Sequence, residues 1–270
     1  MPHFVAVHTG AGNCSHETNK LLKALCKRVC SKVSQLLAEG KSATDAAVAG
    51  TLLLEDSPLT NAGLGSSITD DKKTRTEASI CSTLSGFHCA GDLENVKHPI
   101  KIVELMVNET LSCTSKYIPP RIMVGQCAVD RYSKKDAVIC QTNISTKRSI
   151  RIFYKAEKYF NNEVSAKRQR TALEVANEHQ NNIQEVISGW EPSETIAEYE
   201  DEKEDDKEVE EDKAECEGVG EDDEEEGAEP PGGVDDTVGV VCVDSRGSVT
   251  CAASSGGSVY KYSGRLGKLI

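Results

Sequence analysis

The stretch TVGVVCVDSRGSVTCAASSGG, residues 237–257, decides the fold. Its first apolar run, 238–243, is nearly continuous, as in a strand that is covered on both faces. A turn at 244–247 contains a glycine, and a second strand is expected over 249–253. The stretch therefore predicts an antiparallel hairpin.

The register of this hairpin brings polar groups together at one rim. Pairing centred on the turn places Thr237 opposite residue 254, give or take one. The hydroxyl of Thr237 would then meet further hydroxyls and flexible backbone amides in the segment 254–257, SSGG. We expect a site at the end where the two strands finish together.

The charge of the chain is concentrated in one segment just before this hairpin. Residues 191–236 hold 24 of the 44 acidic residues and 3 of the 31 basic ones. The remaining chain is mildly basic, and this composition predicts an acidic, disordered linker over 191–236. A linker contacting basic partners is the alternative interpretation.

The composition also excludes some classes of protein. The N-terminus lacks a charged region followed by a long apolar core, so a signal peptide is not expected. No stretch approaches the roughly 20 apolar residues that span a bilayer. The 11 cysteines have no regular framework spacing, which favours reduced thiols in an intracellular protein, cytoplasmic and/or nuclear. The basic cluster 167–170 is either a nuclear address or a solvated helix face.

Elsewhere, apolar periodicity and breaker residues predict an alternation of strands and helices. Helices are expected where apolar residues recur at three- and four-residue steps, and strands in short apolar runs. We expect strands over 4–8, 66–69 and 77–81, and helices over 17–40, 44–57, 99–112 and 121–132.

Several of these segments carry a family resemblance. The hairpin, with "DTVGVVCVD", "SSGG" and "GRLG", resembles the type-2 asparaginase family of N-terminal-nucleophile hydrolases. The resemblance covers roughly 4–145 and 234–267. Upstream it rests on "VHTGAG" at 7–12, "LEDSPLTNAGLGS" at 54–66, "EASI" at 77–80, "VKHPI" at 96–100 and "IPPRIMVG" at 118–125.

The resemblance implies an α+β fold, the αββα sandwich of the N-terminal nucleophile hydrolases. It also implies a proenzyme that cuts itself between Asp236 and Thr237. The expected parts are an α-subunit body over 1–190, the acidic linker over 191–236, and the start of the β subunit over 237–270. The family continues well beyond this point, so the sandwich is expected to be incomplete and the chain to be C-terminally truncated.

Cleavage before Thr237 has a chemical purpose. A threonine hydroxyl is a poor nucleophile at neutral pH and needs a nearby base, which the α-amine of an N-terminal threonine supplies. That amine titrates near ~7.7–8.0, so it accepts a proton at cellular pH. We therefore expect Thr237 to be the catalytic nucleophile once the bond to Asp236 is cut.

Two positions near the C-terminus bear on the substrate. Arg265 matches the family's arginine that binds a substrate carboxylate, a task that suits a bidentate guanidinium. Where asparaginases carry an aspartate for the free α-ammonium, this chain has Lys268, which cannot bind an ammonium. This favours an endopeptidase that cleaves proteins after aspartate, and "IPP" with the long linker points to the same branch of the family.

Three further residues match the surroundings of the nucleophile in the family. Ser255 would orient Thr237 or its amine; a plain turn serine is the alternative. Asn61 could hydrogen-bond the reacting carbonyl or a water, and Gly10 belongs to a surrounding loop. A purely structural role is the alternative for both.

The functional expectation is an autoprocessing threonine endopeptidase that needs no cofactor or metal. Its expected partners are proteins with an internal aspartate, with an α/β heterodimer, and a dimer of these, after processing; neither nucleic acid nor membrane is expected. One alternative is an asparaginase or isoaspartyl peptidase. The other is an inactive truncated form that acts as a binding protein.

Overall fold

The computed structural model describes residues 2–10, 15–112, 117–135, 143–163 and 237–267. The chain divides into two compact units, 1–161 with 229–270 and 162–228. Only residues 162 and 163 of the second unit are described, and every described strand belongs to the first unit. The expected linker over 191–236 lies outside the described residues.

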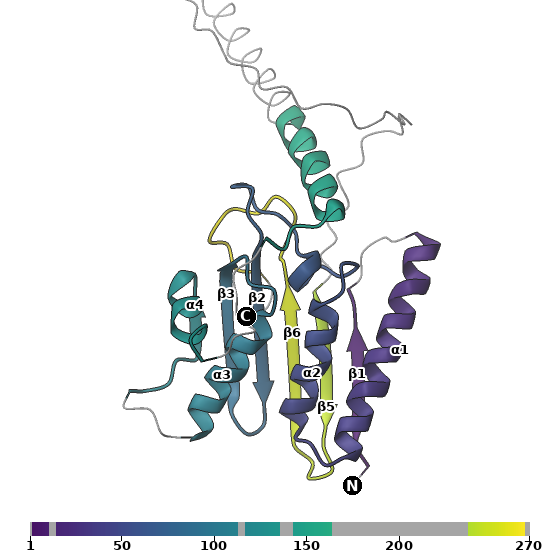
Figure 1. Ribbon diagram of the computed structural model, residues 1–270, viewed down its shortest axis with the longest axis vertical. Coiled ribbons are helices and arrows are strands. Elements are labelled where there is room, and N and C mark those ends of the chain that lie inside the picture. The colour runs from purple at the N-terminus through teal and green to yellow at the C-terminus, as the bar shows by residue number, and fades with distance from the viewer. Residues whose placement is uncertain (1, 11–14, 113–116, 136–142, 164–236, 268–270) are drawn as a thin grey trace, which may run out of the picture. The chain divides into compact units, whose positions relative to one another are not determined.

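The first unit contains both helices and strands (Figure 1), and residues 147–163 are also helical. The elements are β1 Phe4–His8, α1 His16–Ala38, α2 Ala43–Glu55, the 3-10 turn η1 Gly63–Gly65, β2 Arg75–Ser82, β3 Gly86–Glu94, α3 Pro99–Ser112, β4 Ile122–Val124, α4 Gln126–Tyr132, β5 Val238–Val243 and β6 Val249–Ser255.

The strands form one six-stranded mixed sheet in the order β1-β5-β6-β2-β3-β4. All neighbouring pairs are antiparallel except β3 and β4. The hairpin β5–β6 therefore lies between β1 and β2, which come from the N-terminal part of the chain (Figure 1). Both ends of the sequence are needed to complete this sheet.

The first two helices form for reasons that the sequence shows. In α1, Leu22, Leu25, Val29, Val33 and Leu37 recur on one face and are buried, as predicted for 17–40. The helix α2 begins after Ser42, whose side chain accepts a hydrogen bond from the backbone of Asp45. Gly50 lets α2 pack closely against α1, because a Cβ on residue 50 would lie 2.7 Å from a methyl group of Val33.

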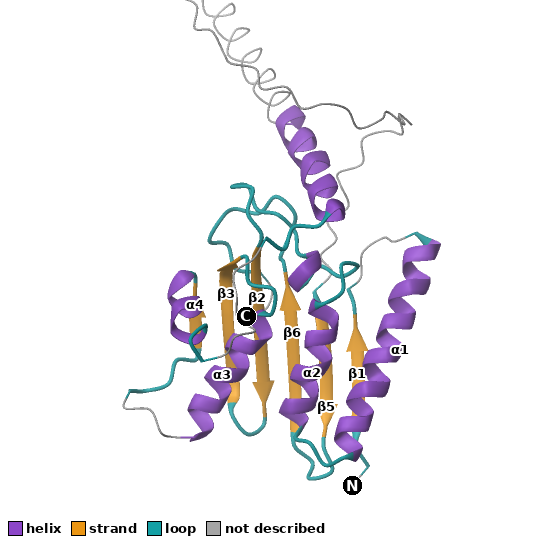
Figure 2. Cartoon of the chain, in the orientation of Figure 1, coloured by secondary structure: helices purple, strands orange, loops and turns teal. Residues whose placement is uncertain are grey.

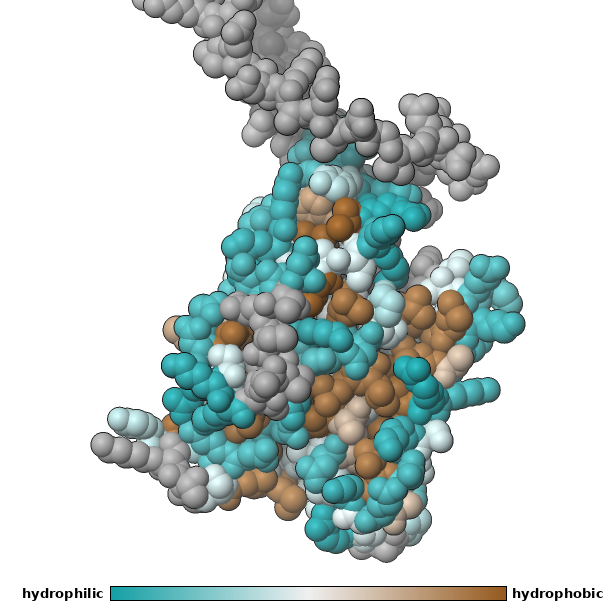
Figure 3. All heavy atoms as spheres, viewed as in Figure 1, coloured by the Kyte–Doolittle hydropathy of each residue, from teal (hydrophilic) through white to brown (hydrophobic). Residues whose placement is uncertain are grey.

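The helices cover one face of the sheet (Figures 1 and 2). Buried residues of α1–α4 and of the strands form one hydrophobic cluster, which includes Val33, Leu54, Ile80, Met106 and Val240. Apolar atoms remain visible among polar ones on the side of the molecule seen in Figure 3. The core thus lies between the helix layer and the sheet, in an α+β arrangement.

The opposite face of the sheet is less covered in the described part of the chain. Cys81 and Cys251, which are paired across β2 and β6, are both exposed. Phe4 on β1 and Ile122 on β4 are 56% and 51% exposed. The second sheet that an αββα sandwich requires is not among the residues that the structure describes.

Two local predictions are wrong. Residues 66–69 are not a strand; Ile68 forms only an isolated bridge with Thr74. The segment 121–132 is not one helix, because Gly125 has φ +65° and separates β4 from α4. The hairpin is confirmed: Val238 pairs with Ser254, within the predicted register.

Candidate active site

Thr237 and Ser255 meet at the end of the hairpin where β5 begins and β6 ends. The Thr237 hydroxyl donates to Ser255 Oγ at 3.2 Å. Thr237 directly precedes β5, and the pairing of Val238 with Ser254 brings the two side chains to the same side of the sheet. Ser255 is 3% exposed, whereas Thr237 is half-buried.

A glycine turn completes the surroundings of Ser255. The backbone N–H of Gly257 donates to Ser255 Oγ at 2.9 Å, so this oxygen accepts two hydrogen bonds. Gly257 has φ +70°, a conformation that glycine adopts without strain. The turn therefore fixes the position of the Ser255 oxygen, and the hydroxyl proton of Ser255 remains available to donate a hydrogen bond.

Asn61 ties this turn to the loop after α2. Its Nδ2 donates to the carbonyl of Gly257 at 2.8 Å, and its Oδ1 accepts from the backbone N–H of Ser67 at 2.8 Å. The backbone carbonyl of Asn61 accepts from the N–H of Gly256. Asn61 thus lies beside the turn that follows Ser255, and these contacts are those of a residue that positions loops.

A buried acid at the end of α2, just before the loop that carries Asn61, joins that helix to the start of α3. Glu55 is fully buried; burial raises its pKa, while hydrogen bonding to His98 acts in the opposite direction. The Glu55 carboxylate accepts from His98 Nδ1 at 3.3 Å and from the backbone N–H of Ile100 at 3.2 Å. Thr60 donates to the carbonyl of Leu54 and shapes the same loop.

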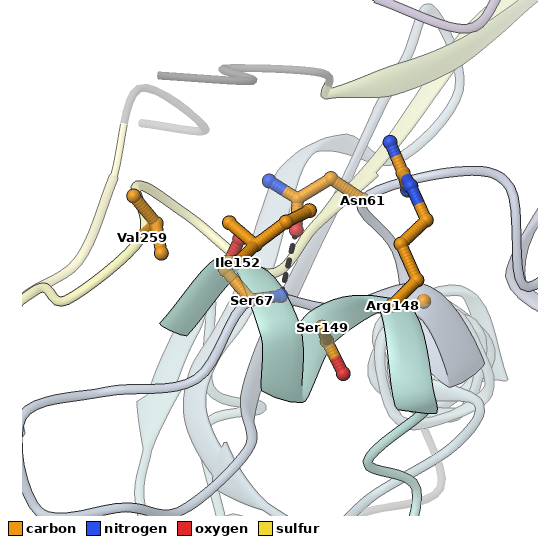
Figure 4. A pocket seen from close by; sticks show the side chains of 7 residues that line it. Asn61, Ser67, Arg148, Ser149, Ile152 and Val259 are labelled. Atoms are coloured by element: carbon orange, nitrogen blue, oxygen red, sulfur yellow. Dashed lines mark hydrogen bonds between the residues drawn. The ribbon is translucent and has the colours of Figure 1, made fainter. Parts of the chain in front are cut away.

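A small pocket opens beside Asn61 (Figure 4). Figure 4 shows the hydrogen bond between Asn61 and Ser67 on one side of it and residues of the 147–163 helix on another. Arg148 Nη1 also donates to the carbonyl of Leu59 at 3.2 Å. The residues that line the pocket are Asn61, Gly65, Ser67, Arg148, Ser149, Ile152 and Val259.

The other predicted residues lie at exposed positions or outside the described part of the chain. Arg265 is exposed, and its Nη1 lies 3.5 Å from Ser258 Oγ. Gly10 ends the segment after β1 with φ +103° and is exposed. Asp236 and Lys268 lie outside the described residues.

The segment 258–267, which carries Arg265, is anchored to the turn before β2. The Asp70 carboxylate accepts from the N–H of Ser263 at 2.9 Å, and the Asp92 carboxylate accepts from the N–H of Gly264 at 3.2 Å. Arg75 joins this anchor through ion pairs with Asp71 at 2.7 Å and Asp92 at 3.2 Å. Burial raises the pKa of Asp71, but hydrogen bonds from Arg75 and Thr69 outweigh it and bring the pKa to about 2.

Sequence reasoning missed two buried charges beside this segment. Lys261 is 5% exposed and Glu77 is 3% exposed. The backbone N–H of Gly267 donates to Glu77 Oε2 at 2.8 Å. The signal for Glu77 is its place opposite Ser255 in the β2–β6 pairing, which only the register shows.

The described residues contain neither a cluster that could hold a metal ion nor a helix that could span a membrane. Among them, no group of three or more His, Cys, Asp or Glu side chains is arranged to hold a metal ion. In the same part of the chain, no helix has the length and hydrophobicity needed to cross a bilayer.

Comparison with known proteins gives related enzymes. A family model described as Asparaginase matches residues 1–185 and 166–268. An isoaspartyl peptidase/L-asparaginase of Nostoc sp. is 34% identical over 114 residues, which are 41% of this chain and 36% of the relative. The isoaspartyl peptidase/L-asparaginase of Xenopus laevis is 29% identical over 111 residues, 41% of this chain and 36% of the relative.

A third relative, the isoaspartyl peptidase of Salmonella typhimurium, is 29% identical over 131 residues, 46% of this chain and 39% of the relative. The chain thus spans less than two fifths of the length of each of these relatives. The family model covers nearly all of the chain, and the fold is the α+β type that the resemblance implies. The chain belongs to the asparaginase family of N-terminal-nucleophile hydrolases.

Proposed function

We propose that this chain is an autoprocessing threonine hydrolase in which the Asp236–Thr237 bond is cut and Thr237 becomes the nucleophile. The observation that carries the proposal is the hydrogen bond from the Thr237 hydroxyl to Ser255 Oγ at the start of β5. Ser255 holds the hydroxyl in one orientation, because its own oxygen is fixed by the N–H of Gly257.

The reaction follows from this geometry. The Thr237 oxygen attacks the carbonyl carbon of Asp236, the C–N bond breaks, and water hydrolyses the resulting ester. The freed α-amine of Thr237 then takes the proton from its own hydroxyl during attack on a substrate carbonyl. In the uncut chain this amine is part of a peptide bond, so the enzyme is inactive until it is processed.

The proposed substrates are proteins, cut after aspartate, as by threonine aspartase (taspase). A site that holds Asp236 beside Thr237 is suited to an aspartate of a substrate, and Arg265 follows the site on an anchored segment. Lys268 is unsuited to the free ammonium of an amino-acid substrate. We further propose an α/β heterodimer after processing and a cytoplasmic or nuclear location.

A second candidate is favoured by the relatives, which are named isoaspartyl peptidases and L-asparaginases. Under that alternative the chain would hydrolyse β-aspartyl dipeptides or free asparagine. The third candidate, a non-catalytic binding protein, requires that Thr237 and Ser255 serve only to pair the two strands.

One assay separates these functions. Purified chain is incubated with an acetylated peptide containing one internal aspartate, with a β-aspartyl dipeptide and with asparagine, and the products are identified by mass spectrometry. Thr237→Ala is the control for each substrate. Cleavage of the acetylated peptide after aspartate is expected; hydrolysis of the other two alone would establish the second candidate, and no hydrolysis would leave the binding protein.

A further inference from the structure

A buried lysine lies beside the turn that follows Ser255 and fixes the hydroxyl pair of Thr237 and Ser255. Lys261 is 5% exposed, and among the described residues its Nζ has no hydrogen-bond partner. Nζ lies 2.6 Å from the position that a Cβ on Gly257 would occupy. The same Gly257 donates its N–H to Ser255 Oγ, which accepts the proton of Thr237. Gly257 is therefore a neighbour of both the Ser255 hydroxyl and Lys261 Nζ, which places an unpartnered amine beside the turn that holds the hydroxyl pair.

Burial and the surrounding charges together lower the pKa of the Lys261 amine. Burial lowers the pKa of Lys261 from the ordinary 10.5, and Glu77 opposes this by favouring the ammonium. Smaller effects come from Arg265 and Arg75, which lower the pKa of Lys261, and from Asp92, which raises it. The balance is a lowered pKa, which is the condition that lets a lysine act as a base.

The uncut chain needs such a base. While the nitrogen of Thr237 is in a peptide bond, it cannot accept a proton, so the hydroxyl requires another acceptor for self-cleavage. The Thr237 proton already points at Ser255 Oγ. Ser255 accepts two hydrogen bonds there, and its own proton is free to pass to a neighbouring group.

We propose that Lys261 accepts the proton of Thr237 through Ser255 during self-cleavage of the uncut chain. This inference rests on the proposed function and adds the base for its first step. As the Thr237 oxygen bonds to the Asp236 carbonyl carbon, its proton moves to Ser255 and the Ser255 proton moves to neutral Lys261. When the C–N bond breaks, the Lys261 ammonium returns a proton through Ser255 to the departing nitrogen of Thr237. Lys261 acts through Ser255 and does not touch the reacting atoms.

Two substitutions at this position separate a base from a structural cation. Lys261→Arg keeps the charge but cannot lose its proton at working pH, and Lys261→Met keeps the length without charge. Both are expected to slow self-cleavage at least about 100-fold, a loss typical of removing acid–base catalysis. Lys41→Met, at an exposed lysine, is the matched control and is expected to cleave like the original chain. Thermal unfolding of each variant shows whether it is folded.

The pH profile gives a readout that a structural role would not change. Glu77 raises the pKa of Lys261, so Glu77→Gln should make the amine neutral at lower pH. The acid limb of the self-cleavage profile should therefore move to lower pH in Glu77→Gln. A folded Lys261→Arg that cleaves at the original rate, or an acid limb that does not move, would overturn the proposal.

A second measurement does not depend on self-cleavage. In chain labelled with 13C-lysine, the Lys261 resonance is the one that Lys261→Arg removes. It should titrate below 10.5 and shift when Ser255 is replaced by alanine. Failure of the original chain to cut would contradict the proposed function, and the titration would then decide the proton route by itself: a Lys261 that titrates normally and ignores Ser255→Ala contradicts it.

Discussion

The hydroxyls of Thr237 and Ser255 are joined by a 3.2 Å hydrogen bond across the open end of the β5–β6 hairpin. The residues of β5 have the sequence VGVVCV. The register of β5 with β6, in which Val238 pairs with Ser254, brings the Thr237 hydroxyl beside Ser255. The strands on either side, β1 and β2, come from the N-terminal part of the chain. These flanking strands cover both edges of the hairpin that brings the two hydroxyls together.

Replacing Ser255 by alanine should slow self-cleavage at least about 100-fold, because the Thr237 hydroxyl loses the acceptor that orients it and receives its proton. The rate is measured by following the full-length mass over time. Ser245→Ala, in the exposed turn of the same hairpin, should leave the rate unchanged. Equal rates for Ser255→Ala and the original chain would mean that the contact has no part in the reaction.

Replacing Asn61 by alanine should lower the free energy of unfolding by about 2–4 kcal/mol, because the Gly257 carbonyl and the Ser67 N–H lose their buried partner. Denaturant unfolding of the purified chain gives this value. Asn143 is exposed and its Oδ1 accepts from the N–H of Ser145, so Asn143→Ala should change stability by no more than about 1 kcal/mol. A similarly small change for Asn61→Ala would show that its contacts do not hold the turn.

The anchor at Asp71 should make stability depend on acid pH. The folded pKa of Asp71 is lowered to about 2 from 3.8, so its contribution is present above 3.8 and is lost as pH falls through about 2. In Asp71→Asn this contribution is absent at every pH. The free energy of unfolding, measured between about pH 5 and about pH 2, should thus fall less steeply for the variant; parallel curves would contradict the assigned ion pair with Arg75.

Replacing Arg265 by alanine should reduce kcat/KM for aspartate-containing peptides roughly 10- to 100-fold, the loss expected for a charged hydrogen-bonding partner of a carboxylate. Arg265→Lys should recover part of it, since a lysine keeps the charge without the bidentate geometry. Arg151→Ala, at an exposed arginine, serves as the control. An unaltered kcat/KM for Arg265→Ala would remove Arg265 from the substrate site.

The hairpin and the first two helices could be predicted because their signals are local. The apolar run 238–243 and the glycine-containing turn are within one short stretch, and α1 repeats its apolar residues regularly. By contrast, β3 has the sequence GFHCAGDLE, in which glycines and polar residues hide the strand. Its pairing with β2 supplies the stability that its own composition lacks.

Part of the candidate site could also be predicted from the sequence. Hairpin symmetry places Thr237 near Ser255, and the family resemblance singles out Asn61. Lys261 and Glu77 were not predictable, because the burial of an isolated charge depends on which distant segments cover it. Glu77 becomes a neighbour of the site only through the pairing of β2 with β6.

The most direct test is the intact mass of the purified 270-residue chain, followed by N-terminal sequencing of any fragments, for the original protein, Thr237→Ala and Thr237→Ser. We predict two fragments in the original chain, one of which begins with Thr237, and none in Thr237→Ala; Thr237→Ser, which keeps a hydroxyl, should cut more slowly at the same bond. A chain that hydrolyses aspartyl substrates while the bond before Thr237 stays intact would contradict the account.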